Sequence, residues 1–149
     1  MNREDEFRFQ VLVEEISTDG KTQEMKKYIQ HGKISTYEHC MQVARLSYEL
    51  NRKLHFHANE RELVRGAFLH DYYLYDWHLP HNRLHGFYHP GVAVENASRD
   101  FKLSSREKNI IASHMWPLTV TKLPKSREAV LVGMADKLCS TKETLFKRR

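Results

Sequence analysis

Apolar residues along this chain recur mainly at spacings of three and four, the period of an α-helix with one face in a core. The sequence shows no sustained alternation of apolar and polar residues and no Asn-Gly hairpin signal. We therefore predict an all-α fold, in which the helices can be placed from their apolar stripes and from their start and stop signals.

Two helices are expected before residue 35. The first covers residues 4–16, with Phe7 and Val11, and Leu12 beside them, facing the core. The second is short, runs through residues 25–29 and ends at Gly32, a residue type that favours the left-handed backbone of a helix C-terminus.

The next helix is predicted to be central and largely buried. Ser35-Thr-Tyr-Glu38 has the sequence of a capping box and predicts its start. The helix then presents an unusually wide apolar surface, formed by Tyr37, Met41, Val43, Ala44, Leu46, Tyr48 and Leu50. His39 lies in its first turn, in line with that surface.

Further start signals predict four more helices. Asn59 with Glu62 opens a helix that ends near His70-Asp71, after which residues 72–88 are expected to form a loop or short irregular helices. The other start signals are Pro90, which places His89 at a helix N-terminus, the capping box Ser104/Glu107, and Ser126.

Composition indicates one soluble domain spanning residues 1–149. The 149 residues are 40% apolar and 29% charged, a globular balance, and no apolar stretch approaches the ~20 residues needed to span a bilayer. The N-terminus lacks the apolar run of a signal peptide, so a cytoplasmic location is expected. Cys40 and Cys139 form no C-x-x-C pair and are expected to be small buried side chains.

Charge does not point to a nucleic-acid partner. The net charge is +5, but the excess is spread along the chain, and the one local cluster is at the C-terminus: Lys142, Lys147, Arg148 and Arg149. The sequence contains no glycine-rich phosphate loop and no aromatic-basic motif of an RNA-binding sheet.

The dipeptide His70-Asp71 stands out because it closes an apolar helical segment. Burying an imidazole and a carboxylate costs free energy unless a partner satisfies them. A divalent metal ion suits both, since neutral imidazole nitrogen and carboxylate oxygen are ordinary ligands of zinc, manganese and iron.

Five helices together offer six such groups at inward or terminal positions: His39, His70, Asp71, His89, His114 and Asp136. Each has an ordinary structural explanation when taken singly. His39 and His114 suit helix ends, and Asp136 has Lys137 beside it. The order H…HD…H…H…D on successive helices makes coincidence a poor explanation of the set.

This order resembles the HD superfamily of metal-dependent phosphohydrolases. The matching segments are Tyr-Glu-His39-Cys-Met-Gln-Val-Ala, Ala-Phe-Leu-His70-Asp71, His89-Pro-Gly-Val-Ala, Ile-Ile-Ala-Ser-His114 and Met-Ala-Asp136-Lys. The resemblance implies a compact helical bundle of the HD-domain type, with a motif core at residues 35–143 after N-terminal helices at 1–34.

The resemblance also implies the ligand set. His39, His70, Asp71 and Asp136 would bind one ion, and His89 and His114 would bind a second, with Asp71 bridging both. The four residues of the first group would also suffice for a mononuclear site. The donors fit one or two divalent ions of iron, manganese or zinc, and the catalytic role falls on Asp71 and His70.

The implied activity is hydrolysis of a phosphoester by a metal-activated hydroxide, on a small phosphorylated metabolite such as a nucleotide. Many relatives continue the HD pair with glycine and lysine, whereas this chain has Tyr72-Tyr-Leu-Tyr. Phosphate contacts are therefore expected from Arg83, His85 and Lys137. His85 has two open interpretations, a substrate contact or an alternative metal ligand, and His78 and His81 are as readily surface residues.

Two alternatives remain open at the level of the sequence. A few HD relatives use the same six ligands to activate oxygen at two irons, so a di-iron oxygenase is the first. The second is a non-catalytic regulator that binds a metal or a nucleotide, which the missing lysine leaves open. The sequence does not indicate an oligomeric state.

Overall fold

A computed structural model describes residues 1–75 and 85–147. Within this part of the chain the elements are α1 (Arg3–Ser17), α2 (Gly20–Gln23), a 3-10 turn (Glu24–Lys27), β1 (Ile29–His31), β2 (Ile34–Ser35), α3 (Thr36–Leu54), α4 (Glu60–Leu69), α5 (His85–Asp100), α6 (Ser105–Ser113) and α7 (Arg127–Lys147). The prediction of an all-α fold is confirmed, with one short hairpin added to it.

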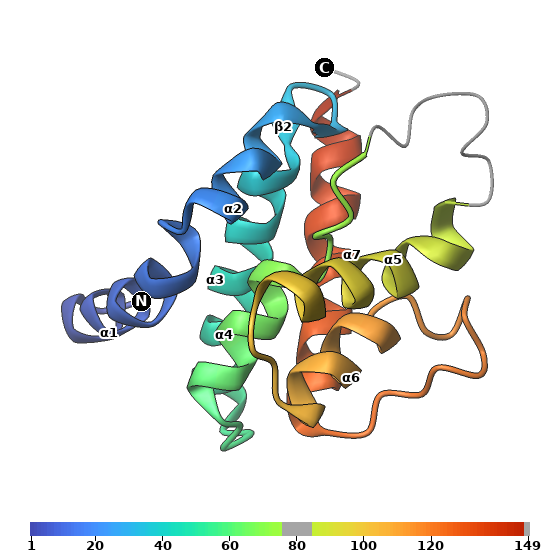
Figure 1. Cartoon of the computed structure of the whole chain (residues 1–149). Helices are drawn as coiled ribbons and strands as arrows, with labels where there is room; N and C mark the ends of the chain where they lie inside the picture. The colour runs from blue at the N-terminus through green and yellow to red at the C-terminus, as the bar shows by residue number, and fades with distance from the viewer. Residues whose placement is uncertain (76–84, 148–149) are drawn as a thin grey trace.

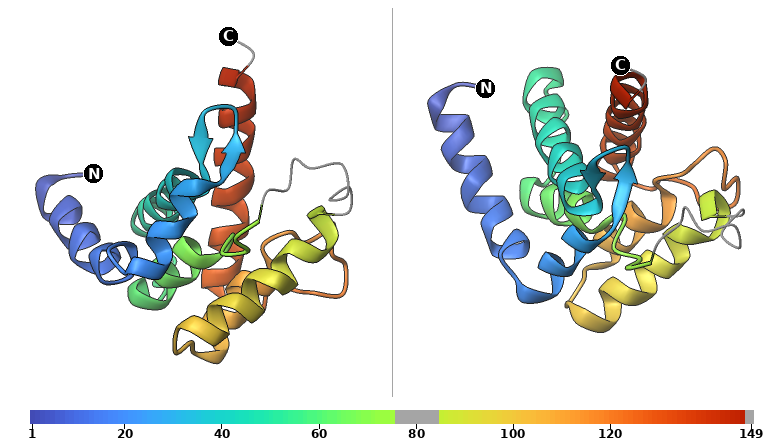
Figure 2. Two further views of the ribbon diagram at one scale, coloured as in Figure 1. Left: turned by 45° about the horizontal axis from the view of Figure 1, so that its top comes forward. Right: turned by 90° about the horizontal axis from the view of Figure 1, so that it is seen from above.

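The helices surround a core to which each of the long ones contributes. α3 and α7 lie next to one another and α4 packs against α3 (Figure 1). α6 packs against both α4 and α7, and α5 packs against α6. Seen from above, the hairpin stands beside the ends of α3 and α7 (Figure 2). The fully buried side chains include Val43, Leu63, Phe68, Ile110 and Leu131.

Four predicted start signals are present as hydrogen bonds, among them that of Ser126, whose Oγ accepts from the backbone N–H of Ala129 at 3.0 Å. Ser35 Oγ accepts from the backbone N–H of Glu38 at 3.1 Å, and Asn59 Oδ1 accepts from that of Glu62 at 2.9 Å. At α6 the capping box is complete in both directions, between Ser104 and Glu107. Local side-chain chemistry therefore places these helix N-termini as predicted.

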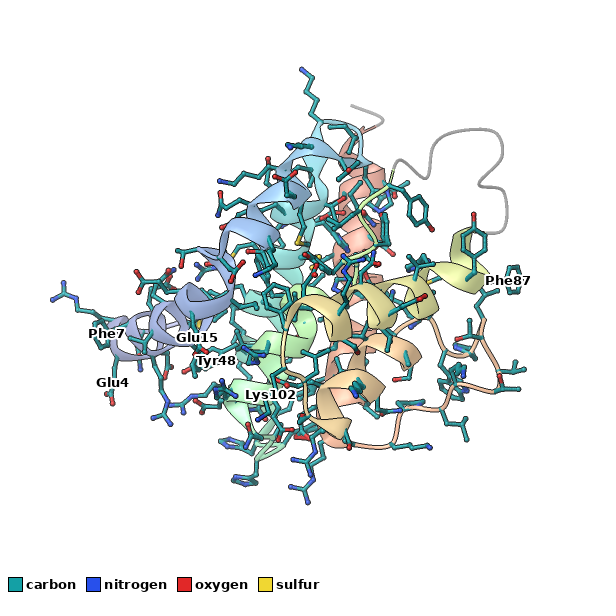
Figure 3. The ribbon with its side chains drawn as sticks, in the orientation of Figure 1. Glu4, Phe7, Glu15, Tyr48, Phe87 and Lys102 are labelled. Atoms are coloured by element: carbon teal, nitrogen blue, oxygen red, sulfur yellow. The ribbon has the colours of Figure 1, made fainter. Side chains whose placement is uncertain are left out.

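The predicted inner face of α1 is wrong for Phe7 and Val11, whereas Leu12 is partly buried against the core as predicted. Phe7 and Val11 are 72% and 56% exposed, whereas Phe9, Val13 and Ile16 are buried. Figure 3 shows Phe7 at the outer end of the molecule. The helix carries two apolar stripes of similar spacing, and its packing against α4 and α3 decides which of them is covered.

The second helix also ends earlier than predicted. After the 3-10 turn the backbone becomes extended at Tyr28, and Gly32 has φ 59° in the turn of a hairpin rather than at a helix end. The backbone N–H of Thr36 donates to the carbonyl of Tyr28 at 2.8 Å, which closes this hairpin onto the start of α3. The hairpin packs against α3 and α7, and a local sequence pattern does not report such a contact.

The start of α5 differs from the prediction as well. The helix begins at His85, so Pro90 lies inside it and His89 is one turn within the helix rather than at its N-terminal boundary. Pro90 is the sixth residue of the helix, where it removes the hydrogen bond to the carbonyl four residues earlier, yet α5 continues to Asp100.

The structure bears on two expectations from composition, the state of the cysteines and the presence of a membrane-spanning helix. Cys40 and Cys139 are both buried free thiols, as predicted. In the described part of the chain, no helix combines the length and the apolar character that crossing a bilayer requires.

Candidate metal centre

The six predicted metal ligands converge at the centre of the helix bundle. His39 lies in the first turn of α3 and Asp136 lies in α7, while His89 comes from α5. His70 and His114 each directly follow the last residue of a helix, α4 and α6, and Asp71 follows His70. All six are buried, and their candidate ligand atoms form two groups that share Asp71.

The first group joins α3, the end of α4 and α7. Nε2 of His39 lies 3.0 Å from Oδ1 of Asp136, and Nε2 of His70 lies 3.3 Å from the same oxygen. The two nitrogens are 3.5 and 3.2 Å from Oδ2 of Asp71. Two imidazole nitrogens and two carboxylate oxygens thus face one point.

The second group joins Asp71 to α5 and α6. Oδ1 of Asp71 lies 3.2 Å from Nε2 of His89 and 3.3 Å from Nε2 of His114. The two nitrogens are 2.8 Å apart. Asp71 therefore directs one oxygen to each group, which is the arrangement of a carboxylate that bridges two ions.

Hydrogen bonds from Nδ1 to helix-end carbonyls orient two of the imidazoles. Nδ1 of His70 donates to the carbonyl of Ala67 at 2.6 Å, and Nδ1 of His114 donates to that of Ile111 at 2.7 Å. Both acceptors belong to the last helical turn, where carbonyl groups lack partners within the helix. Since Nδ1 carries the hydrogen, the lone pair of the neutral ring is at Nε2, which faces the cluster.

The contacts of Asp71 indicate that a cation fits here. Its Oδ1 is buried and has no hydrogen-bond partner, although the two histidine nitrogens lie close to it. Burial lowers the pKa of His114, and the contact with Asp71 offsets burial only in part. A neutral imidazole then turns its lone pair toward a carboxylate oxygen, and a divalent ion between them would satisfy both atoms.

Electrostatics in the first group also favour positive charge. Burial alone would lower the pKa of His39, but hydrogen bonds to Asp136 and Glu143 outweigh burial and raise it to about 10. Burial would raise the pKa of Asp136, yet the neighbouring His70 and His39 hold it well below the usual range of a carboxyl group. The carboxylates thus stay ionised and attract either a proton or a metal ion to this point.

Glu143 is a part of the site that the sequence analysis missed. Its carboxylate is buried and accepts from Nδ1 of His39 at 2.9 Å, so that Nε2 of His39 faces the cluster. The available signal was its position seven residues after Asp136, on the same face of α7. Gln30, which contacts Asp71 from β1, was missed without any such signal.

The predicted phosphate contacts have different outcomes. Arg83, His78 and His81 lie outside the described residues, as does the side chain of His85, whose backbone begins α5. Nζ of Lys137 donates to the carbonyls of His114 and Gly133, at 3.2 and 3.3 Å. The roles of Arg83, His85 and Lys137 toward a substrate stay predictions.

Comparison with known proteins gives one family. The model of the HD domain family matches residues 36–141, which is most of the chain and includes the six clustered residues. Comparison with curated proteins and with solved structures gave no significant match.

Proposed function

Because the chain belongs to the HD domain family, a superfamily of metal-dependent phosphohydrolases, we propose that it hydrolyses a phosphoester of a small phosphorylated metabolite. A nucleotide is the first substrate to test. The proposal assigns His39, His70, Asp71 and Asp136 to one divalent ion, and Asp71, His89 and His114 to a second.

One observation carries this proposal more than any other. Asp71 is buried between two pairs of imidazole nitrogens and directs a different oxygen toward each pair. A purely structural aspartate would accept well-aligned hydrogen bonds, whereas Oδ1 of Asp71 faces two imidazole nitrogens at 3.2 and 3.3 Å without a hydrogen bond of acceptable geometry. The donor set of imidazoles and carboxylates is suited to iron, manganese or zinc.

The chain's own residues would prepare the centre for phosphate chemistry. Divalent ions bound there would lower the pKa of a bound water, so that hydroxide is available near neutral pH, and would offset the charge of phosphoryl oxygens. The helix-end carbonyls and Glu143 hold the imidazoles in one orientation, so that little reorganisation is needed. Asp71 and Asp136 contribute two negative charges, which leaves two divalent ions with excess positive charge to attract an anionic substrate.

The test begins with the metal content of protein purified without added metal. The protein is then stripped with EDTA, reloaded with Mn²⁺, and assayed with para-nitrophenyl phosphate, its bis ester and a panel of nucleotides. We expect hydrolysis that needs the metal and that Asp71→Asn abolishes, because the amide cannot replace a bridging carboxylate. Asp100→Asn is the matched control, since Asp100 accepts from the hydroxyl of Tyr72 and lies outside both ligand groups.

Three results would each overturn the proposal. If Asp71→Asn retained full metal content and full activity, the assignment of the centre would be wrong. If the iron-loaded protein consumed oxygen in the presence of a substrate and released no phosphate in the panel, a di-iron oxygenase would replace the hydrolase. Metal binding without turnover on any substrate would favour a regulator.

A further inference from the structure

Gln30 is a buried amide that reaches the candidate metal centre from outside the region matched by the family model. Gln30 lies in β1 and is 6% exposed. The family match begins six residues later, at residue 36. The hairpin packs against both α3 and α7, the helices that carry His39 and Asp136. Gln30 thus enters the centre between two of the ligand-bearing helices.

The amide connects Asp71 to a tyrosine. Nε2 of Gln30 donates to Oδ2 of Asp71 at 3.0 Å. Oε1 of Gln30 accepts from the hydroxyl of Tyr73 at 2.7 Å and from that of Thr36 at 3.3 Å. The amide has one workable orientation, because the flipped form would place its carbonyl oxygen against a carboxylate oxygen.

The hydrogen bond from Gln30 limits the rotation of the Asp71 carboxylate about its Cβ–Cγ bond, which decides where each oxygen of a bridging carboxylate points. Rotation of a carboxylate about its Cβ–Cγ bond has broad minima, so packing alone defines the plane weakly. In the described structure, Oδ2 accepts from Gln30 while Oδ1 has no hydrogen-bond partner. Gln30 therefore contacts only the oxygen that faces His39 and His70, while the other oxygen faces His89 and His114.

We propose that Gln30, held by Tyr73, is a positioning residue that sets the plane of the Asp71 carboxylate and so determines how tightly the centre binds divalent ions. The inference rests on the proposed function, since it takes Asp71 to be a metal ligand. Gln30 does not itself join either ligand group. It acts through Asp71, in the way that hydrogen-bond partners of metal ligands generally do.

The experiment compares Mn²⁺ binding by the full chain and three variants. Gln30→Met keeps the length of the side chain and removes both hydrogen-bonding atoms. Tyr73→Phe removes only the hydroxyl that orients the amide. The third variant combines the two, and electron paramagnetic resonance follows both free and bound Mn²⁺.

Two matched controls separate positioning from general loss of packing. Gln23→Met removes an amide that donates to the carbonyl of Ser17, away from the centre. Tyr72→Phe removes the neighbouring hydroxyl, which donates to Asp100. Circular dichroism of each variant in EDTA verifies that it folds.

We expect Gln30→Met to raise the Kd for Mn²⁺ about tenfold or more and to change the spectrum of the bound ion at saturation. Tyr73→Phe is expected to change the Kd and the spectrum in the same direction as Gln30→Met, but by a smaller amount. The double variant should bind no more weakly than Gln30→Met, because both residues act through one chain of hydrogen bonds. Neither control should change the Kd or the spectrum.

Wild-type affinity and a wild-type spectrum in folded Gln30→Met would overturn the positioning role. If that variant does not fold, Tyr73→Phe decides, and its equality with Tyr72→Phe would overturn the role. Asp71→Asn distinguishes failure of the positioning role from failure of the metal centre. If Asp71→Asn loses Mn²⁺ binding while the Gln30 and Tyr73 variants keep wild-type binding, only the role of Gln30 is refuted. If Asp71→Asn also keeps wild-type binding, the metal centre is refuted as well.

Discussion

Oε2 of Glu143 lies 2.9 Å from Nδ1 of His39, while the other ring nitrogen of His39 lies 3.0 Å from Asp136. One histidine thus joins two carboxylates that lie seven residues apart in α7. Glu143 holds the ring and increases the basicity of the nitrogen that faces the cluster, the usual effect of a carboxylate behind a metal-binding histidine.

We expect Glu143→Ala to weaken Mn²⁺ binding about 10- to 100-fold, because it removes the acceptor that orients His39. Glu143→Gln should have a smaller effect, since its amide oxygen can still accept from Nδ1. The measurement is a Mn²⁺ titration, with Glu95→Gln on the exposed side of α5 as the control. Equal affinity in Glu143→Ala and wild type would contradict the assignment of Glu143.

The two ligand groups make a prediction about stoichiometry. His114→Asn can retain a donor near the position of Nδ1, which binds the carbonyl of Ile111, but it lacks Nε2. We expect the metal content to fall from about two ions per chain to about one, because the group around His39 is untouched. Elemental analysis of the reloaded protein measures this content.

The control for this experiment is His57→Asn. His57 is exposed and has φ 55°, a conformation that asparagine tolerates. An unchanged metal content in His114→Asn would show that the second group does not hold an ion.

Metal binding is predicted to release protons. Hydrogen bonds to Asp136 and Glu143 outweigh burial and raise the pKa of His39 to about 10, so the metal-free protein carries this proton at pH 7.5. An ion can reach the nitrogen only when the proton leaves, and metal affinity should therefore increase with pH in this range. Calorimetry in buffers of different ionisation enthalpy should show a heat that depends on the buffer, and a heat independent of the buffer would refute this prediction.

The close approach of α4 and α6 predicts a stability effect away from the ligands. A Cβ atom at Gly66 would lie 2.6 Å from Cδ1 of Ile110 and 3.0 Å from its Cβ. We expect Gly66→Ala to lower the free energy of unfolding by about 1–3 kcal/mol, since the two helices must move apart. Urea unfolding measures the change.

Gly91 in α5 provides the matched control. A Cβ atom there would meet nothing within 4 Å, and helical alanine is more stable than glycine by up to about 1 kcal/mol. Gly91→Ala should therefore be neutral or stabilising. If Gly66→Ala were as stable as Gly91→Ala, the contact between α4 and α6 would be looser than the structure indicates.

The local chemistry of the sequence predicted much of the helical framework. The caps at Ser35, Asn59 and Ser104 depend on residues three positions away, so their signals are complete within a short window. The residues that converge at the candidate metal centre could likewise be predicted from the sequence, because a buried His-Asp pair needs a partner and the spacing resembles a known family.

Packing between distant segments decided the rest. The choice between the two apolar stripes of α1, which covers Phe9 and exposes Phe7, depends on where α3 and α4 lie. The contact of Gln30 with Asp71 spans 41 residues, and that of Glu143 with His39 spans 104. The sequence by itself determined where most helices begin and which side chains are suited to bind metal. Only the tertiary structure decided which faces are buried and which partners orient the ligands, because hydrophobic periodicity carries no information about what lies across a core.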